Sequence, residues 1–138
     1  MERAGETQGP ISITERSIAY SVRMIQLYRE LSSDSAGRVI ARQLLRSATS
    51  VGANVHEAQA GQSKADFIAK MSIAHKEATE SRYWLRVIAE AQLIQDKKLV
   101  GLRDETEQII RILGKILVTA RGRNRRTTYT ESEASNEI

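Results

Sequence analysis

Carboxylates and histidines are the residues of this sequence that could hold a metal ion. Glu57, Glu77 and Glu80 lie in segments that we expect to be helical. Di-metal sites in helical bundles need Glu-x-x-His pairs that project inward, and no acidic residue here is followed three positions later by a histidine. His56 and His75 are the only histidines, and neither belongs to a cluster with metal-ligand spacing. The sequence therefore predicts no metal site.

Nucleophilic catalysis and phosphate-binding loops also lack a signature in the sequence. The chain has no cysteine and no Gly-x-Ser-x-Gly elbow. Gly61 and Gly101 stand alone, and Gly122 lies in a basic segment, so no glycine-rich loop is present to cradle phosphates. We therefore expect a protein that is not an enzyme and that binds no cofactor.

Basic side chains are concentrated near the C-terminal end of the chain. The segment 111–126 holds no acidic residue and six basic ones: Arg111, Lys115, Arg121, Arg123, Arg125 and Arg126. The whole chain has 21 basic and 17 acidic residues, so its net charge of +4 comes from this segment. The segment could neutralise nucleic-acid phosphates, form a solubilising tail that complements the helix dipole, or contact an anionic membrane. The absence of acids favours nucleic acid, and these six residues are our candidates for phosphate contact.

A stripe of small and polar residues is a second candidate site. Its members follow a 4-3-4-3 spacing: Gln43, Ser47, Ser50, Asn54 and Glu57. The stripe is either the solvated flank of a surface helix or a contact where another helix approaches closely and hydrogen-bonds. Gly52 lies beside it, and because Gly costs about 1 kcal/mol relative to Ala inside a helix, its presence favours close packing. We take these residues as candidates for helix-helix or subunit contacts.

Three further residues are candidates for the same kind of contact: Glu80, Tyr83 and Trp84. Glu80 is expected to pair with an arginine such as Arg46 or Arg82. Trp84 is expected at the edge of the core or in a subunit seam, with its indole N–H bonded to an acceptor.

The elements that must position these residues follow from the spacing of apolar side chains. Ser12 and Glu15 form a capping box that predicts a helix over residues 13–31. Its expected buried stripe is Ile18, Val22, Ile25 and Tyr28. A second helix is expected over residues 36–60, ended by Gly61 in the left-handed C-cap conformation. Its expected buried stripe is Ile40, Leu44, Ala48, Val51, Val55 and Ala58.

Two more helices are expected in the second half of the chain, over residues 64–94 and 97–121. The third has the expected buried stripe Phe67, Met71, Ala74, Ala78, Leu85 and Ile88. The fourth has the expected buried stripe Leu99, Leu102, Thr106, Ile109, Leu113, Ile116 and Ala120. We expect residues 1–11 to be a flexible lead-in, residues 12–121 to form the folded bundle, and residues 122–138 to be a disordered tail, basic and then acidic.

Length and composition favour a single helical domain. The chain has 138 residues, one proline and only 4% aromatic residues. No apolar run approaches the roughly 20 residues that span a bilayer, and the first residues carry acids with no apolar stretch. We therefore predict an all-α protein, an antiparallel up-down-up-down four-helix bundle, in the cytoplasm.

Two segments of the sequence resemble the signatures of a known family. The run QLLRSATSVGANVHEA from Gln43 to Ala58 and the run IAHKEATESRYWL from Ile73 to Leu85 are similar to the second and third helices of bacterial four-helix bundle proteins. These proteins are encoded within intervening sequences of 23S ribosomal RNA genes. The resemblance covers about residues 12–121. Trp84 to Arg86 and Arg111 to Gly114 are also similar to a relative of that family, the accessory variability determinant of diversity-generating retroelements.

The resemblance implies more than composition does. It implies a homopentamer that binds RNA or DNA and, for the retroelement protein, a reverse transcriptase. Our leading hypothesis is a homo-oligomeric bundle that binds nucleic acid through its basic surface. The alternative is a protein-protein adaptor that recruits a partner such as a reverse transcriptase without binding nucleic acid itself.

Overall fold

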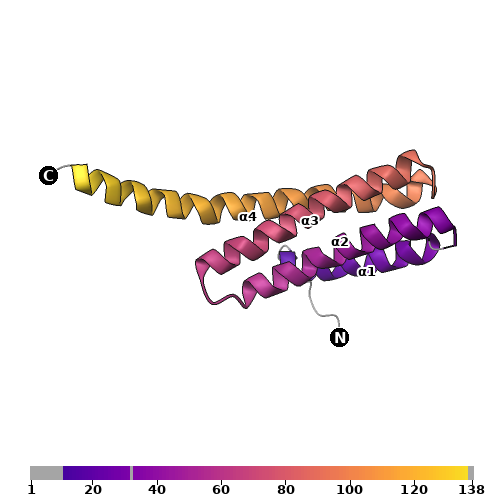
Figure 1. Cartoon of the computed structure of the whole chain (residues 1–138), viewed down its shortest axis with the longest axis horizontal. Helices are drawn as coiled ribbons and strands as arrows, with labels where there is room; N and C mark the ends of the chain where they lie inside the picture. Colours follow the sequence, from indigo (N-terminus) through magenta and orange to yellow (C-terminus); the bar gives the residue numbers. More distant parts are fainter. Residues whose placement is uncertain (1–10, 32, 137–138) are drawn as a thin grey trace, which may run out of the picture.

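The computed structural model describes residues 11–31 and 33–136, with side chains described as far as Gly122. It contains, in chain order, α1 (Ile13–Leu31), α2 (Ser35–Gln59), α3 (Lys64–Glu90) and α4 (Asp96–Asn136). Figure 1 shows successive helices running in opposite directions, with α4 projecting beyond the other three. The predicted all-α four-helix bundle is therefore confirmed. Most of the expected N-terminal lead-in, residues 1–10, lies outside the described residues.

Short polar side chains begin the first three helices. The Ser12 hydroxyl accepts the backbone N–H of Glu15 at 3.2 Å. The side chains of Asp34 and Ser63 each accept the N–H three residues later, at 3.3 and 3.1 Å. Each bond satisfies one of the amides that have no partner within the first turn of a helix.

The ends of α2 and α3 differ from the sequence prediction. The left-handed conformation expected at Gly61 is wrong, because no glycine of the described chain has a positive φ. Ala60 instead closes α2 in the right-handed conformation, and its N–H bonds to the His56 carbonyl at 3.3 Å. The chain reverses after α3 at Gln92, whose φ is 54°, so α3 ends at Glu90 and not at residue 94.

The end of α4 also differs. The apolar spacing predicts an end at about Arg121 and a disordered tail over residues 122–138, whereas the helix continues to Asn136. The apolar stripe marks where α4 packs against other helices. Beyond that point the sequence has no proline, so nothing removes a backbone hydrogen bond of the helix.

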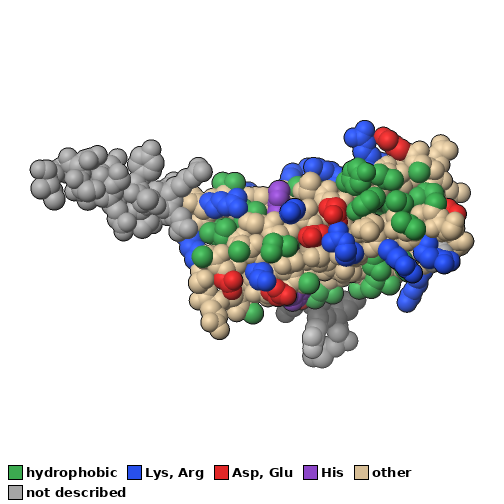
Figure 2. Space-filling model, viewed as in Figure 1, with side chains coloured by type: hydrophobic (Ala, Val, Ile, Leu, Met, Phe, Trp, Pro, Cys, Tyr) green, Lys and Arg blue, Asp and Glu red, His purple; other side chains and the backbone are tan. Residues whose placement is uncertain are grey.

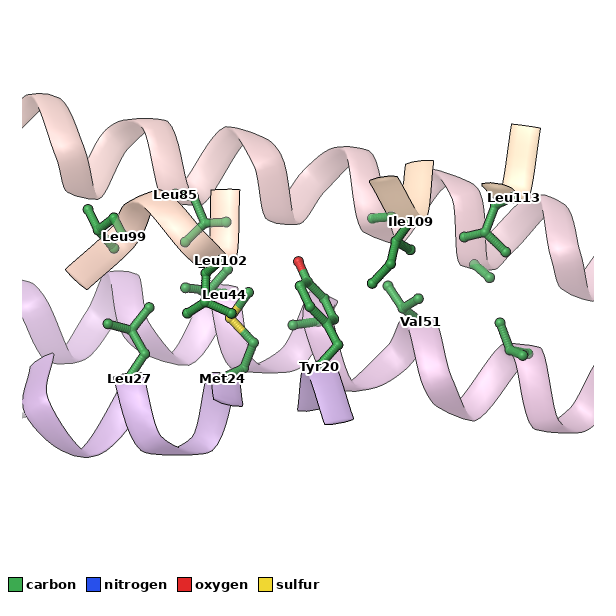
Figure 3. Close-up of a cluster of buried hydrophobic side chains, with 14 of the residues drawn as sticks. Tyr20, Met24, Leu27, Leu44, Val51, Leu85, Leu99, Leu102, Ile109 and Leu113 are labelled. Atoms are coloured by element: carbon green, nitrogen blue, oxygen red, sulfur yellow. The ribbon is translucent and has the colours of Figure 1, made fainter. Parts of the chain in front are cut away.

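The core is a continuous cluster of aliphatic side chains from all four helices, several of which Figure 3 shows. The stripes predicted for α2, α3 and α4 supply most of it, with Ile40, Phe67, Ile116 and Ala120 only partly buried. Several contacting positions are small, including Ala48, Ala74 and Ala78, which are all fully buried. Small side chains at these positions let the helix axes approach closely.

The stripe predicted for α1 is wrong. Ile18, Val22 and Ile25 are 46%, 49% and 38% exposed. The residues of α1 that are buried lie on another side of the helix: Ser17, Tyr20, Met24, Leu27 and Leu31. Apolar residues cover two sides of α1, so periodicity alone supports two stripes, and packing against the other helices selects the one that includes Tyr20.

Tyr20 and two ion pairs join α1 to α4. The Tyr20 hydroxyl lies 2.6 Å from the Thr106 hydroxyl in the core. At the surface, Arg16 makes a two-bond contact with Glu105, with distances of 3.0 and 2.9 Å. Lys98 pairs with Glu30 at 3.4 Å. Burial raises the pKa of Tyr20 to about 12.

Replacement of Tyr20 by Phe tests this contact. At neutral pH we expect Tyr20→Phe to lower the free energy of unfolding by about 1 kcal/mol, because one buried hydrogen bond is lost. The folded pKa lies above the value of 10.0 for an exposed tyrosine, so the Tyr20 contribution is complete below pH 10 and is lost as pH rises toward 12. Urea unfolding at several pH values should therefore show a steeper alkaline loss for the wild type than for Tyr20→Phe. Parallel pH curves would contradict this account.

Candidate nucleic-acid interface

The buried side of α4 determines which of its side chains face solvent. Leu99, Ile109 and Leu113 are buried in the core. At 3.6 residues per turn, Arg111 and Lys115 then lie on the other side of the helix, and both are exposed. The two cations predicted from composition are therefore held outward by a helix that is well anchored.

No carboxylate offsets these two cations. Residues 108–122 of α4 contain no acidic residue. Among the described side chains, Arg111 and Lys115 form no salt bridge, whereas Arg16, Arg46 and Arg82 are all paired with glutamates. An exposed ammonium and an exposed guanidinium one turn apart, neither paired with a carboxylate among the described residues, form a local positive potential that suits phosphate.

The neighbouring side of α3 extends this surface. Arg121 donates to the Ser72 hydroxyl at 2.9 Å, which holds the end of the cation row against α3. Gly114 lies against His75 of α3, since a Cβ added at Gly114 would be in van der Waals contact with His75 Nε2 at 3.6 Å. Figure 2 shows Lys and Arg side chains, together with a histidine, on the upper part of the molecule, where Figure 1 places α3 and α4. The side chains of Arg123, Arg125 and Arg126 lie outside the described residues.

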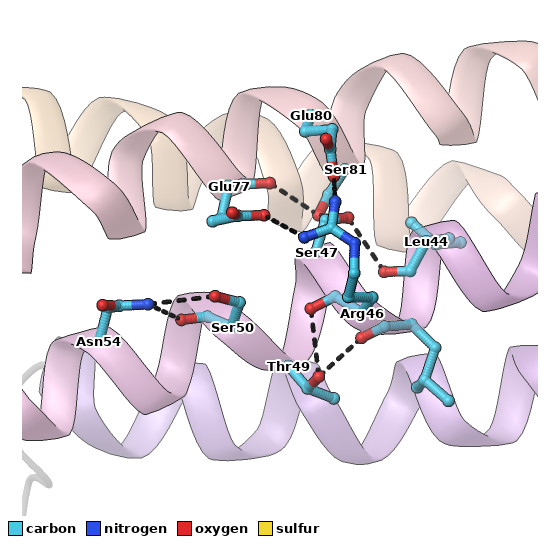
Figure 4. A network of polar contacts seen from close by, with 10 residues as sticks. Leu44, Arg46, Ser47, Thr49, Ser50, Asn54, Glu77, Glu80 and Ser81 are labelled. Carbon is cyan, nitrogen blue, oxygen red and sulfur yellow. Dashed lines mark hydrogen bonds and ion pairs between the residues drawn. The ribbon is translucent and has the colours of Figure 1, made fainter.

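The polar stripe predicted on α2 lies along the seam between α2 and α3 of the same chain, which Figure 4 shows from close by. Ser47 is fully buried, and its hydroxyl lies 2.8 Å from the Ser81 hydroxyl. Arg46 contacts Glu77 at 3.4 Å and pairs with Glu80, one of the two arginine partners expected for that residue. A buried hydroxyl pair flanked by ion pairs fixes α2 against α3.

The remaining residues of the stripe are engaged to different degrees. The Asn54 amide donates to the Ser50 carbonyl at 2.8 Å and to the Ser50 hydroxyl at 3.1 Å, both on its own helix. Glu57 accepts from Lys70 of α3 at 2.8 Å, and this hydrogen bond raises the pKa of Lys70. Gln43 is exposed. Gly52 faces α1, where an added Cβ would lie 3.3 Å from the Ser17 hydroxyl.

Tyr83 and Trp84 lie side by side on α3 in different surroundings. Tyr83 is exposed, whereas Trp84 is half-buried and packs against the core. The two rings meet edge to face, with centroids 4.9 Å apart and planes inclined at 68°. The hydrogen bond expected for the Trp84 indole does not form within the described part of the chain, where its buried Nε1 has no partner.

Comparison with known families identifies the bundle. The model of the 23S rRNA-intervening sequence protein matches residues 10–115. This chain belongs to that family. A solved structure from Bacteroides thetaiotaomicron, a protein of unknown function from the S23 ribosomal protein family, is 36% identical, with a TM-score of 0.73 over 77% of this chain and 98% of that one. No curated protein matches the chain.

The boundary of the match divides the predicted cations. The 23S rRNA-intervening sequence protein match includes Arg111 and Lys115 and ends before Arg121. The two cations on the acid-free side of α4 are thus part of the segment shared with the family, and the more C-terminal ones are not.

Other cations on this side of the molecule lie outside the acid-free segment of the sequence and were not predicted as phosphate contacts. Arg82 and Arg86 of α3 and Arg103 of α4 lie near the loop that joins the two helices. Acidic residues alternate with them along the chain, so a search for an acid-free run passes over them. Their shared position follows only from the antiparallel packing of α3 and α4.

Metal sites and membrane-spanning helices are two further features to consider in the described part of the chain. No group of three or more His, Asp or Glu side chains there could hold a metal ion. None of its helices is long and apolar enough to cross a membrane.

Proposed function

We propose that this 23S rRNA-intervening sequence protein is a non-enzymatic, cytoplasmic homo-oligomer that binds nucleic acid. The observation that carries the proposal is the acid-free, exposed side of α4, where Arg111 and Lys115 have no carboxylate partner among the described residues. A phosphate can contact these two side chains without breaking an existing ion pair. The free energy gained from the release of condensed counterions is therefore not reduced by the loss of a salt bridge. The family description, which refers to 23S rRNA, supports RNA as the ligand.

The biological setting belongs to the same proposal. One setting is the biology of the rRNA intervening sequence itself, in which the protein would bind structured RNA. The other is a diversity-generating retroelement, in which it would serve as an accessory factor. The similarity of Trp84 to Arg86 and of Arg111 to Gly114 to the retroelement protein supports the second setting.

Self-association is the second part of the proposal, with a pentamer as the assembly. Ile18, Val22 and Ile25 form an apolar stripe along α1 that is left exposed by the described residues of the other helices. Aliphatic side chains at helical spacing on an exposed face are typical of protein-protein contacts. A second copy of the chain that covers this stripe would remove it from water.

The same stripe favours the alternative function. An apolar surface suits a protein and not a phosphate backbone, so α1 could recruit a different protein such as a reverse transcriptase. In that case the bundle is an adaptor, and the cations of α4 are solubilising.

Removal of the two cations tests nucleic-acid binding. We expect Arg111→Gln combined with Lys115→Gln to weaken binding to a structured RNA, with the slope of log affinity against log salt reduced by about 2, since each phosphate contact contributes about 0.9. Fluorescence anisotropy over a salt series measures both quantities. Arg42→Gln combined with Lys64→Gln is the matched control, since it removes the same charge from exposed positions on α2 and α3.

Two results bear on the alternative. Equal slopes for the two double variants would show that net charge, and not the α4 surface, governs binding. No binding of RNA or DNA at low salt by the wild type would contradict the proposal and favour the adaptor.

A version ending at Arg121 measures the share of binding due to the more C-terminal cations.

A charge placed in the α1 stripe tests self-association. Val22 is half exposed in the chain, so Val22→Glu should leave the helical content unchanged by circular dichroism. Light scattering after size-exclusion chromatography should show a fall in mass from the oligomer toward the monomer, because a carboxylate would be buried without a partner. Val39→Glu, at a 62% exposed position on α2, is the control and should keep the wild-type mass. An unchanged mass for Val22→Glu would exclude this face.

A further inference from the structure

A groove of about 830 Å³ lies between α3 and α4, near the loop that joins them. Its deeper part includes Leu85 and Thr106, which are both buried in the bundle. Its outer part is lined by arginine, tyrosine and carboxylate side chains: Arg82, Tyr83, Arg86, Arg103, Asp104 and Glu107. A groove of this size, with Leu85 and Thr106 at its floor and polar groups around it, suits a ligand no larger than a nucleotide.

Tyr83 gives the groove an aromatic wall. Its side chain is 57% exposed, which is unusual for a large ring on a helix that is otherwise well packed. The edge-to-face contact with Trp84 fixes the ring, because Trp84 is itself packed against the core. A fixed aromatic ring with a free face is the element on which unpaired bases stack in single-strand binding proteins.

The charged side chains of the groove favour a base over a chain of phosphates as the ligand. Arg82 is paired with Glu107 at 3.6 Å, and Arg86 with Glu90 at 3.1 Å. Arg103 has no carboxylate within salt-bridge distance in the described part of the chain, so it alone is available to a phosphate. The carboxylates of Asp104 and Glu107 repel further phosphates but can accept hydrogen bonds from the amino groups of a base.

We propose that this groove binds one unpaired base of a single-stranded nucleic acid, with the base stacked on Tyr83 and an adjacent phosphate held by Arg103. The proposal rests on the proposed function and specifies its ligand as an unpaired segment. Arg103 and Arg111 lie two turns apart on α4, about 12 Å at 1.5 Å per residue. One strand that enters the groove can therefore continue onto the acid-free side of α4.

The test compares two fluorescein-labelled probes, a short single-stranded RNA and a blunt RNA duplex of the same sequence, by anisotropy with the full chain. Tyr83→Leu removes the ring and keeps an apolar side chain. It should weaken single-strand binding about tenfold, the order of the loss of one base–aromatic stack, and leave duplex binding unchanged. Tyr83→Phe keeps the stacking face and should bind both probes as the wild type does.

Arg103→Gln provides a second variant that does not depend on the ring. It should weaken single-strand binding more than Arg42→Gln, which removes an exposed arginine of α2 outside the groove.

The outcomes separate this inference from the proposed function. If the wild type binds both probes and Tyr83→Leu leaves single-strand binding unchanged, or weakens both probes equally, the base site is wrong while binding by α4 stands. If the wild type binds neither probe at low salt, the proposed function is wrong and the base site is wrong with it.

Discussion

Burial of one side of α4 is the constraint on which the rest of this structure depends. Leu99, Ile109 and Leu113 enter the core, and the helical repeat then places Arg111 and Lys115 in solvent. The Arg16–Glu105 pair and the Tyr20–Thr106 hydroxyl contact set the rotation of α4 against α1. The core therefore fixes the side of α4 on which these cations lie, and the hydrogen bond from Arg121 to Ser72 joins the end of the row to α3.

The α2–α3 seam has one of the two roles that its sequence pattern predicted, a contact between helices of the same chain. Ser47 and its neighbours join two helices of one chain through the Ser47–Ser81 pair and the glutamate partners of Arg46. Among the described residues, the face left without a partner is the apolar stripe of α1, centred on Val22. Aliphatic side chains exposed at helical spacing favour a second protein surface on α1.

The sequence predicted the fold well where only one apolar stripe was present. The stripes of α2, α3 and α4 place most of their residues in the core, but α1 has two stripes, and periodicity could not select between them. The cations of α4 were visible as an acid-free run, and Tyr83 was a candidate for a helix or subunit contact. The groove that brings Tyr83 and Arg103 together could not be predicted, because it exists only after α3 and α4 pack together. The unpaired Trp84 N–H could not be predicted either, since hydrogen-bond satisfaction depends on neighbours distant in sequence.

The central claim is that nucleic acid binds along α4 and the adjacent side of α3. Ultraviolet crosslinking of the full chain to a single-stranded RNA, with the modified peptides mapped by mass spectrometry, tests it most directly. The account predicts crosslinks in the α4 segment that contains Arg111 and Lys115 and at Tyr83 of α3. Crosslinks confined to α1 and α2 would contradict it.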